Sequence, residues 1–173
     1  MEASIARVVI AQLPDVMALI KWAVAQMEKQ QIFQWDDIYP DEATLKADME
    51  TETLYGISVS QQLAGIVALN TAEPPEYQDI PWQYNNALVV HRLCVHPDYQ
   101  NIGIARKLMQ FAEQFARENQ YTSIRLDTMV ENPIAGNLYR KLNYTEQGLV
   151  TFRKGNFVCF EKLIAQMRPE SDI

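Results

Sequence analysis

Hydrophobic residues recur along this chain with two different periods, and the period changes from one segment to the next. Residues 6–10 are mostly apolar and predict a short strand. Behind Pro14, apolar residues recur every three or four positions from Val16 to Met27, which predicts a helix. A weaker helix is predicted over residues 40–52. The chain therefore begins with a strand followed by two helices.

The next segments alternate between apolar runs and turn residues. Residues 55–59 and 63–69 are apolar on either side of a polar turn, which predicts a hairpin. Residues 71–86 contain three prolines and form a connection longer than most loops in compact domains. Residues 87–95 predict a strand, and Pro97 ends it.

The last part of the chain predicts an alternation of helices and strands. Residues 106–119 place their apolar side chains on one face, as an amphipathic helix does, and 123–128 read as a strand. Residues 87–128 thus form a strand, loop, helix and strand, the unit that builds parallel sheet. One further helix and two closing strands are predicted over 132–142, 144–150 and 156–164.

Composition fits one α/β domain. The 173 residues are 48% hydrophobic and 21% charged, enough to bury a substantial core. We expect the domain to span residues 1–165 and residues 166–173 to form a flexible tail. No apolar run approaches the roughly 18 residues of a membrane helix, and no secretory signal is recognisable. We therefore expect a cytoplasmic protein that does not bind membranes.

The net charge of −7 argues against a nucleic-acid partner, because a phosphate backbone favours a basic surface. The charge is unevenly distributed, with −9 over residues 1–86 and +2 over residues 87–173. This asymmetry suits a C-terminal half that holds an anionic cofactor and an N-terminal half that faces a cationic substrate. An acidic solvated surface explains the charge equally well.

The cysteines and histidines do not have the spacing of a metal site. Cys94 and Cys159 each lie in an apolar run, which is typical of buried reduced thiols. His91 and His96 are five residues apart near one strand and are expected to face opposite sides. We expect no metal.

The loop 100–106, between a predicted strand and a predicted helix, is the strongest candidate for a binding site. Gly103 and Ala105 are small enough to let a ligand approach the backbone. Exposed N–H groups at the positive end of a helix dipole bind pyrophosphate, and Arg106 and Lys107 add positive charge. A tight turn alone would also explain one glycine.

The neighbouring residues carry a family resemblance. The run 92–109 resembles the central acetyl-coenzyme A motif of the GNAT family of N-acetyltransferases, whose core pattern is Gln/Arg-x-x-Gly-x-Gly/Ala. Gln100, Gly103 and Ala105 fill that pattern. The spacing is neither the three-glycine dinucleotide fingerprint nor a Walker loop. A second run, 132–144, is similar to the family's later motif of Asn, Ala, Leu-Tyr, a turn and an aromatic residue.

The resemblance implies the acyl-CoA N-acyltransferase (GNAT) fold, an α/β domain with a twisted mixed sheet of about six to seven strands flanked by about four helices. It implies that the fourth and fifth strands splay apart and that the pantetheine arm of acetyl-CoA lies against the backbone between them. It also implies which residues contact this cosubstrate: Leu93, Val95, Gln100, Asn101, Ile102, Gly103, Ile104, Ala105, Arg106, Asn132 and Tyr139.

Two of these residues have further implied roles. Tyr139 matches the family's general acid, a phenol with a pKa of about 10 that can protonate the departing coenzyme A thiolate. Asn132 would hydrogen-bond the pantetheine arm, cap the helix that follows, or do both.

The general base is not given by the motifs. Some family members carry a glutamate on the strand before the loop, and this strand has none. His91 is the candidate base or water-positioning residue, because strict alternation puts it on the same face as Val89, Leu93 and Val95. A purely structural histidine is the alternative.

The acceptor pocket is expected to include Trp35 and Tyr39, which flank two aspartates. Two aromatic rings and two carboxylates suit an alkylammonium group. Aromatic side chains that pack under a solvated acidic loop are the alternative. Relatives of this fold often pair exposed strands, so a homodimer is expected.

The leading interpretation is an N-acetyltransferase that moves the acetyl group of acetyl-CoA to a primary amine. The amine, on a small molecule or a peptide, would attack directly in a ternary complex, without a covalent enzyme intermediate. The alternative is a non-catalytic acyl-CoA-binding regulatory module. A dinucleotide-binding protein is disfavoured by the single glycine in the loop.

Overall fold

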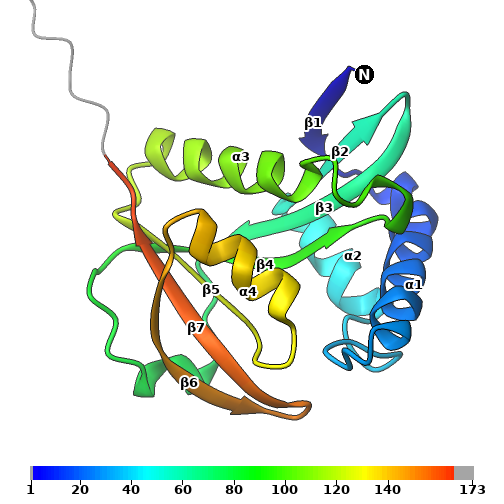
Figure 1. Ribbon diagram of the computed structural model, residues 1–173. Helices are drawn as coiled ribbons and strands as arrows, with labels where there is room; N and C mark the ends of the chain where they lie inside the picture. The colour runs from blue at the N-terminus through cyan, green and yellow to red at the C-terminus, as the bar shows by residue number, and fades with distance from the viewer. Residues whose placement is uncertain (1, 166–173) are drawn as a thin grey trace, which may run out of the picture.

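Seven strands form one mixed sheet in the computed structural model, which describes residues 2–165 (Figure 1). The predicted tail 166–173 lies outside the described residues. The strands are β1 (Ala3–Arg7), β2 (Leu54–Val59), β3 (Gln62–Asn70), β4 (Ala87–Val95), β5 (Ser123–Met129), β6 (Thr145–Phe152) and β7 (Gly155–Leu163). The helices are α1 (Leu13–Lys29), α2 (Glu42–Glu50), α3 (Ile104–Glu118) and α4 (Pro133–Lys141), with short 3-10 turns at Ile10–Gln12, Pro75–Asp79 and Pro97–Tyr99.

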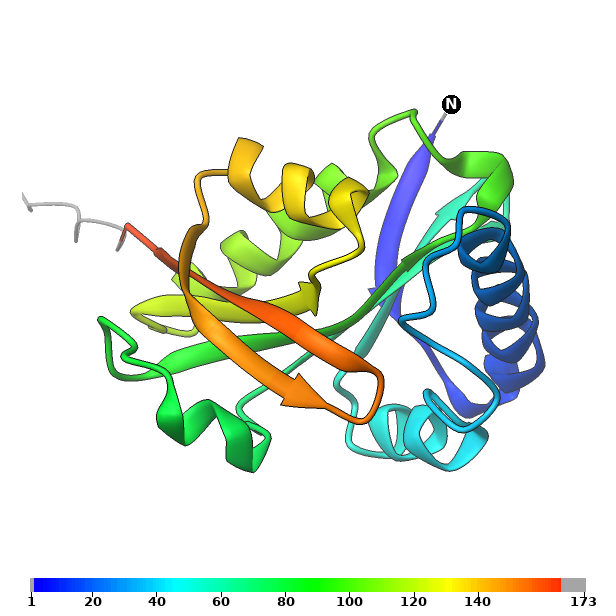
Figure 2. The same cartoon turned by 60° about the horizontal axis from the view of Figure 1, so that its bottom comes forward.

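The strand order β1-β2-β3-β4-β5-β7-β6 contains one parallel pair, β4 with β5. Those two strands pair only at their beginnings, Ala87–Val89 with Ser123–Arg125. Beyond this short ladder β4 continues to Val95 and β5 to Met129, and the strands diverge (Figure 2). The splay that the family resemblance implied is therefore present, together with the expected mixed sheet and flanking helices.

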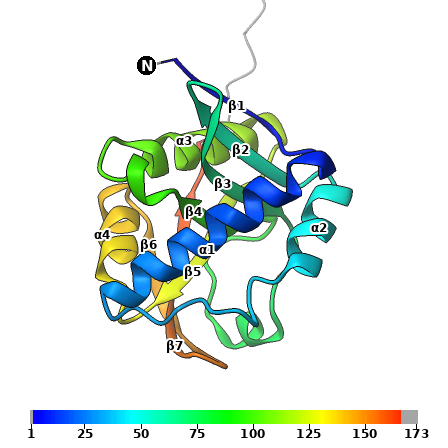
Figure 3. The ribbon, with the colours of Figure 1, turned by 90° about the vertical axis from the view of Figure 1, so that its right-hand side faces the viewer.

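Two helices cover each face of the sheet. In Figure 3, α1 runs diagonally across one face with α2 beside it, and α3 lies on the far side. One core cluster joins Leu108 and Met109 of α3 to β2–β5 and β7, and another joins Val16 and Leu19 of α1 to β2 and β3. Among the helices of residues 2–165, none has an apolar stretch long enough to cross a membrane.

Most sequence-based elements are confirmed to within about two residues, but the first strand is wrong. It was predicted at residues 6–10, whereas β1 is Ala3–Arg7 and Ile10 begins a 3-10 turn. β1 is an edge strand that pairs with β2 from Ala3 to Arg7, so its position follows from its partner. Val9 and Ile10 are exposed despite their hydrophobicity, which is why the apolar run misled the prediction.

A β-bulge in β4 changes the face on which side chains lie. Pairing with β3 shifts between the partners of Ile66 and Ala68, and Arg92 of β4 has a φ of 53°. Val90 before the bulge and Leu93 after it both pack on the α3 side, whereas His91 lies on the opposite side. The prediction that His91 shares a face with Leu93 and Val95 is therefore wrong, because the bulge interrupts strict alternation.

The buried side chain of Arg125, on β5, connects the long segment 71–86 to the sheet. Nε of Arg125 lies 2.9 Å from Oε2 of Glu161, and Nη1 lies 2.7 Å from Oε1 of Glu73. Nη2 of the same side chain donates to the Tyr84 carbonyl, and the guanidinium lies 4.6 Å from the centroid of the Trp82 ring. This network fixes one side of the opening between β4 and β5.

Candidate functional site

A row of free backbone donors begins where β4 leads into α3. Among residues 2–165, no backbone oxygen accepts a hydrogen bond from the N–H groups of residues 101–106, and the first bond of α3 runs from Lys107 N–H to the Gly103 carbonyl. The first turn of a helix always leaves such donors, and its dipole adds positive charge. The row therefore has the donors and the charge that suit an anion, at the loop where the sequence predicts a binding site.

Gly103 keeps the space beside this row open. Its φ is 86°, in the left-handed region, and a Cβ built on it would meet no atom within 4 Å. A side chain here would strain the backbone and project into open space beside the loop. The residues present thus fit a pyrophosphate held by backbone groups.

A cavity of about 680 Å³ runs from this loop to Tyr139 between the splayed strands. Of the predicted acetyl-CoA contacts, only Ile102 is absent from its lining, and the Ile102 side chain is half exposed. The lining includes Leu93, Val95, Gln100, Asn101, Gly103, Ile104, Ala105, Arg106, Asn132 and Tyr139.

Asn132 caps α4 and also forms a hydrogen bond with Gln34, which precedes α2 in the sequence. Its Oδ1 accepts the Ala135 N–H at 3.2 Å, the bond of an N-cap residue. Its Nδ2 donates to Oε1 of Gln34 at 2.9 Å, and the same oxygen accepts the Thr128 hydroxyl at 3.2 Å. Sequence analysis gave Gln34 no separate role, because its partners lie more than ninety positions away.

A second cavity, of about 540 Å³, opens on the other side of Tyr139. Four residues line both cavities and mark their junction: Gln34, Trp35, Leu93 and Tyr139. The Tyr139 side chain is 5% exposed, and its hydroxyl has no hydrogen-bond partner among the described residues. Burial, together with the nearby Asp127 carboxylate, raises the pKa of Tyr139 above its ordinary value. The junction therefore holds a protonated hydroxyl that can donate to a ligand.

A sequence comparison assigns the chain to a family. The sequence model of the Acetyltransferase (GNAT) family matches residues 16–144, three quarters of the chain. The chain belongs to the GNAT family. Both cavities and the loop between β4 and α3 lie largely within the matched region.

Named relatives of this GNAT protein include acetyltransferases of several bacteria and archaea. The streptothricin acetyltransferase of Escherichia coli is 29% identical over 103 residues, which span 60% of this chain and 53% of that relative. A GNAT-family acetyltransferase structure from Streptococcus agalactiae 2603 has a TM-score of 0.83 at 21% identity, covering 95% of this chain and 96% of its own. The PaiA N-acetyltransferase of Thermoplasma acidophilum, solved in complex with coenzyme A, has a TM-score of 0.71 at 18% identity, covering 94% and 99%.

In this GNAT protein, His91 lines the second cavity but is held as a neutral side chain. Its Nε2 lies 2.8 Å from Oδ1 of Asn70, and burial together with the Arg92 cation lowers the pKa of His91 to about 4. A neutral imidazole of such low basicity is a weak acceptor of protons.

Trp35 and Tyr39 both line the second cavity, where the sequence predicted the acceptor to bind. Of the two carboxylates between them, that of Asp36 is already paired. Asp36 pairs with Arg153 at 2.8 Å and with Lys154 at 3.3 Å, and the hydrogen bonds from Arg153 hold the pKa of Asp36 well below its usual value. The Asp36 carboxylate therefore fastens the loop to the β6–β7 turn, and charge complementarity to an ammonium group cannot come from it.

Asp127, on β5, lines the second cavity but was not among the site residues predicted from the sequence. Its Oδ2 accepts the Tyr77 hydroxyl at 2.6 Å. No sequence signal pointed to it, because Tyr77 lies in the long connection fifty residues away.

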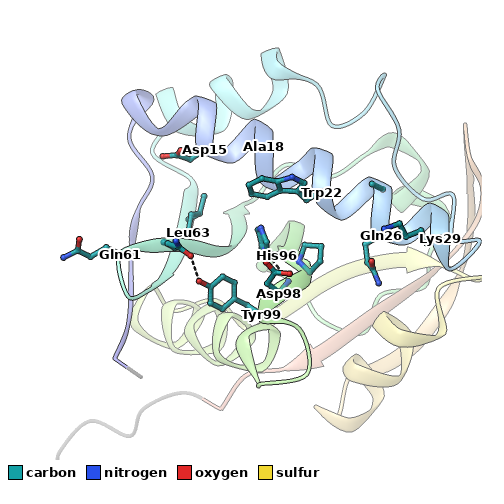
Figure 4. A pocket seen from close by; sticks show the side chains of 13 residues that line it. Asp15, Ala18, Trp22, Gln26, Lys29, Gln61, Leu63, His96, Asp98 and Tyr99 are labelled. Carbon is teal, nitrogen blue, oxygen red and sulfur yellow. Dashed lines mark hydrogen bonds and ion pairs between the residues drawn. The ribbon is translucent and has the colours of Figure 1, made fainter.

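A third cavity, of about 810 Å³, lies against α1 on the outer side of the loop (Figure 4). His96 lines it, with Nδ1 accepting the Asp98 N–H at 3.1 Å and its ring centroid 4.5 Å from that of Trp22. The Tyr99 hydroxyl donates to Oε1 of Gln62 at 2.6 Å. These contacts fasten the start of loop 100–106 to α1 and β3, and His96 lines neither of the other two cavities.

Neither thiol is placed for nucleophilic chemistry. Cys94 and Cys159 are buried, and burial raises the pKa of each to about 12. Within residues 2–165, no group of three or more His, Cys, Asp and Glu side chains could hold a metal ion.

Proposed function

We propose that this GNAT protein transfers the acetyl group of acetyl-CoA to a primary amine. The observation that carries the proposal is the junction at Tyr139, where a cavity suited to coenzyme A meets a second cavity suited to an acceptor. Two substrates that bind on opposite sides of one hydroxyl would meet there in a ternary complex.

Acetyl-CoA would occupy the first cavity, which runs from the loop between β4 and α3 to Tyr139. The N–H groups of residues 101–106 would bind its pyrophosphate, with Arg106 adding charge, and Asn132 would face its pantetheine arm. Gly103 supports this assignment, since only a residue without a side chain leaves that space free.

Tyr139 would donate a proton to the sulfur as the carbon–sulfur bond breaks. Its hydroxyl is protonated at neutral pH, and the mostly buried Tyr139 side chain lines both cavities. Because the leaving thiolate is only weakly basic, we expect this donation to contribute near the lower end of the roughly 100-fold to 10,000-fold range of acid–base groups.

The amine would enter the second cavity between aromatic walls that include Trp35 and Tyr39. The resemblance to the streptothricin acetyltransferase of Escherichia coli makes streptothricin one amine to test, although the chain spans only about half of that relative's length. His91 remains a predicted pocket residue that could position the amine or a water molecule.

The first experiment is a thermal-shift assay with acetyl-CoA, coenzyme A and NAD. A ligand at about 100 times its dissociation constant stabilises the native state by roughly 2.7 kcal/mol. Acetyl-CoA and coenzyme A should raise the melting temperature of the wild type, and NAD should not. In a Gly103→Asp variant the shift should disappear. Gly155→Asp is the matched control, because Gly155 also has a positive φ, 131°, but lies in the β6–β7 turn.

Turnover is measured next as thiol release with propylamine, putrescine, L-lysine, an alanine-initiated tripeptide and streptothricin. Release that depends on one of these amines supports the enzyme. Binding of acetyl-CoA without amine-dependent release from any of them would favour the alternative, a non-catalytic acyl-CoA-binding module. Absence of a thermal shift with either coenzyme A ligand would refute the cofactor assignment.

A further inference from the structure

We propose that Asp127 is the general base for the acceptor and that the acceptor arrives as a primary alkylammonium ion bound to this carboxylate. The inference deepens the proposed acetyl transfer and rests on it. It adds the residue that receives the proton and the charge of the substrate.

The position of Asp127 follows from the splay of the sheet. β4 and β5 part after Ala87–Val89, and Asp127 lies on β5 beyond the end of that ladder. Its neighbour Leu126 packs in the core on the α3 and α4 side, so the Asp127 side chain lies on the other face of β5. Both residues line the second cavity, because it opens where the strands part. Tyr139 lines the same cavity, and its hydroxyl is close enough to sense the Asp127 charge.

A hydrogen bond fixes the Asp127 carboxylate, and no cation among the described residues pairs with it. Tyr77, which is 1% exposed, donates its hydroxyl to Oδ2 at 2.6 Å, and Trp82 Nε1 fixes the Tyr77 backbone by donating to its carbonyl at 2.9 Å. No cation within residues 2–165 forms a salt bridge with Asp127. The second oxygen, Oδ1, receives no hydrogen bond from the described residues.

The other charged groups that line the cavity are already paired. Arg92 is bound to Asp48, Arg153 and Lys154 to Asp36, and Glu73 to Arg125. The uncharged titratable groups that face the carboxylate are Tyr77, Tyr139, His91 and the Cys159 thiol. Arg153 and Lys154 share the one carboxylate of Asp36 and so keep one positive charge between them. Of the two carboxylates that line the cavity, Glu73 and Asp127, only Asp127 has no cationic partner among the described residues, and beside aromatic walls it suits an alkylammonium ion.

Asp127 is a better base than His91 at neutral pH. Oδ1 of Asp127 receives no hydrogen bond from the described residues, whereas His91 donates its Nε2–H to Oδ1 of Asn70, which fixes the imidazole in one tautomer. Burial raises the pKa of Asp127 to about 6, against the hydrogen bond from Tyr77 that lowers it, while the pKa of His91 falls to about 4. A base works best when its pKa lies near the working pH.

The ammonium nitrogen gives one proton to Asp127, and its freed lone pair attacks the thioester carbonyl carbon. The nitrogen–carbon bond forms and the carbon–sulfur bond breaks. The second nitrogen proton leaves with the thiolate as coenzyme A thiol, relayed through the Tyr139 hydroxyl, and Asp127 returns its proton to solvent. The products are the acetamide, coenzyme A and one proton.

The test compares kcat/KM across pH 5 to 9 for the wild type and an Asp127→Asn variant, using the most active amine of the panel named above. Asn keeps the size and can still accept the Tyr77 hydrogen bond. We expect a loss of at least about 100-fold, with the acetyl-CoA thermal shift unchanged. A His91→Gln variant should lose much less.

A second variant separates a catalytic role from a structural one. Tyr77→Phe removes the hydrogen bond that lowers the pKa of Asp127, so the acidic limb of the wild-type profile, near pH 6, should move to higher pH. Near-wild-type activity of Asp127→Asn, or an acidic limb that stays in place in Tyr77→Phe, would overturn the assignment to Asp127. A wild type that releases no thiol with any amine would instead overturn the proposed function and this inference with it.

Discussion

Asp48 and Arg92 form a buried two-point ion pair, with Nε 2.5 Å from Oδ2 and Nη2 2.7 Å from Oδ1. Their side chains are 9% and 8% exposed. Asp48 belongs to α2, and Arg92 occupies the bulge of β4 with a φ of 53°. Nη1 of Arg92 also donates to the Tyr39 hydroxyl at 3.0 Å. The pair therefore holds the bulge, α2 and a wall of the acceptor cavity in one arrangement.

Removal of one partner of this pair should destabilise the fold. Asp48→Ala leaves the Arg92 cation buried without its counter-charge, and we expect a loss of about 3–5 kcal/mol of unfolding free energy in urea titrations. The double variant Asp48→Ala/Arg92→Ala should lose less than the sum of the two single changes. Lys46→Ala, on the same helix and in an exposed pair 3.9 Å from Glu50, is the control and should stay within about 1 kcal/mol of wild type.

Tyr139→Phe should separate catalysis from binding. The change removes the only polar atom of a buried side chain, so we expect kcat to fall by about 100-fold while the acetyl-CoA thermal shift is kept. Tyr144→Phe is the matched control. Its ring centroid lies 6.1 Å from that of Tyr139, and its hydroxyl donates to Glu113 at 3.3 Å, outside both cavities. An equal loss of kcat in both variants would contradict the proton-donor role of Tyr139.

The ion pair between Asp36 and Arg153 should affect the binding of the amine and not the binding of acetyl-CoA. Arg153→Ala frees the loop that carries Trp35 and Tyr39 from the β6–β7 turn, so the KM for the amine should rise several-fold with kcat little changed. Steady-state kinetics with each substrate varied in turn measures this. Arg7→Ala, which breaks an exposed pair with Glu52 on the far edge of the sheet, should leave both KM values unchanged.

The raised pKa of Asp127 should appear in the stability of the protein. The folded state holds this proton up to about pH 6, whereas the ordinary pKa of an aspartate side chain is 3.8, so the folded state binds more protons between these values. Wild-type stability is therefore lost as pH rises through this window. Relative to Asp127→Asn, we expect the wild type to lose on the order of 3 kcal/mol between pH 3.5 and pH 7. The His91 contribution is common to both proteins and cancels. Parallel stability curves over this range would contradict the shift.

Direct transfer predicts that neither thiol is needed. A Cys94→Ala/Cys159→Ala double variant should retain thiol-release activity, although its unfolding midpoint will fall because both side chains are buried. Mass spectrometry of the wild type with acetyl-CoA and no amine should detect no acetylated protein. A stoichiometric acetyl-cysteine that disappears on addition of amine would establish a covalent intermediate instead.

The loop between β4 and α3 and most of the elements around it could be predicted from the order of residues alone. The small residues Gly103 and Ala105 and the amphipathic pattern of α3 are local properties, and local sequence was enough to predict the loop and the helix; the left-handed φ of Gly103 came from the structure. Asn132 at the start of α4 could be predicted in the same way, because an N-cap depends on residues that are adjacent in the sequence.

Which side chains line the second cavity depends on contacts between distant parts of the chain. The bulge at Arg92 depends on Asp48 from another element, and it moved His91 away from the face that alternation gave it. The basicity of Asp127 depends on Tyr77, on burial, and on cations that are paired elsewhere. Periodicity reports neighbours along the chain, whereas strand register, desolvation and charge pairing depend on residues that meet only after folding.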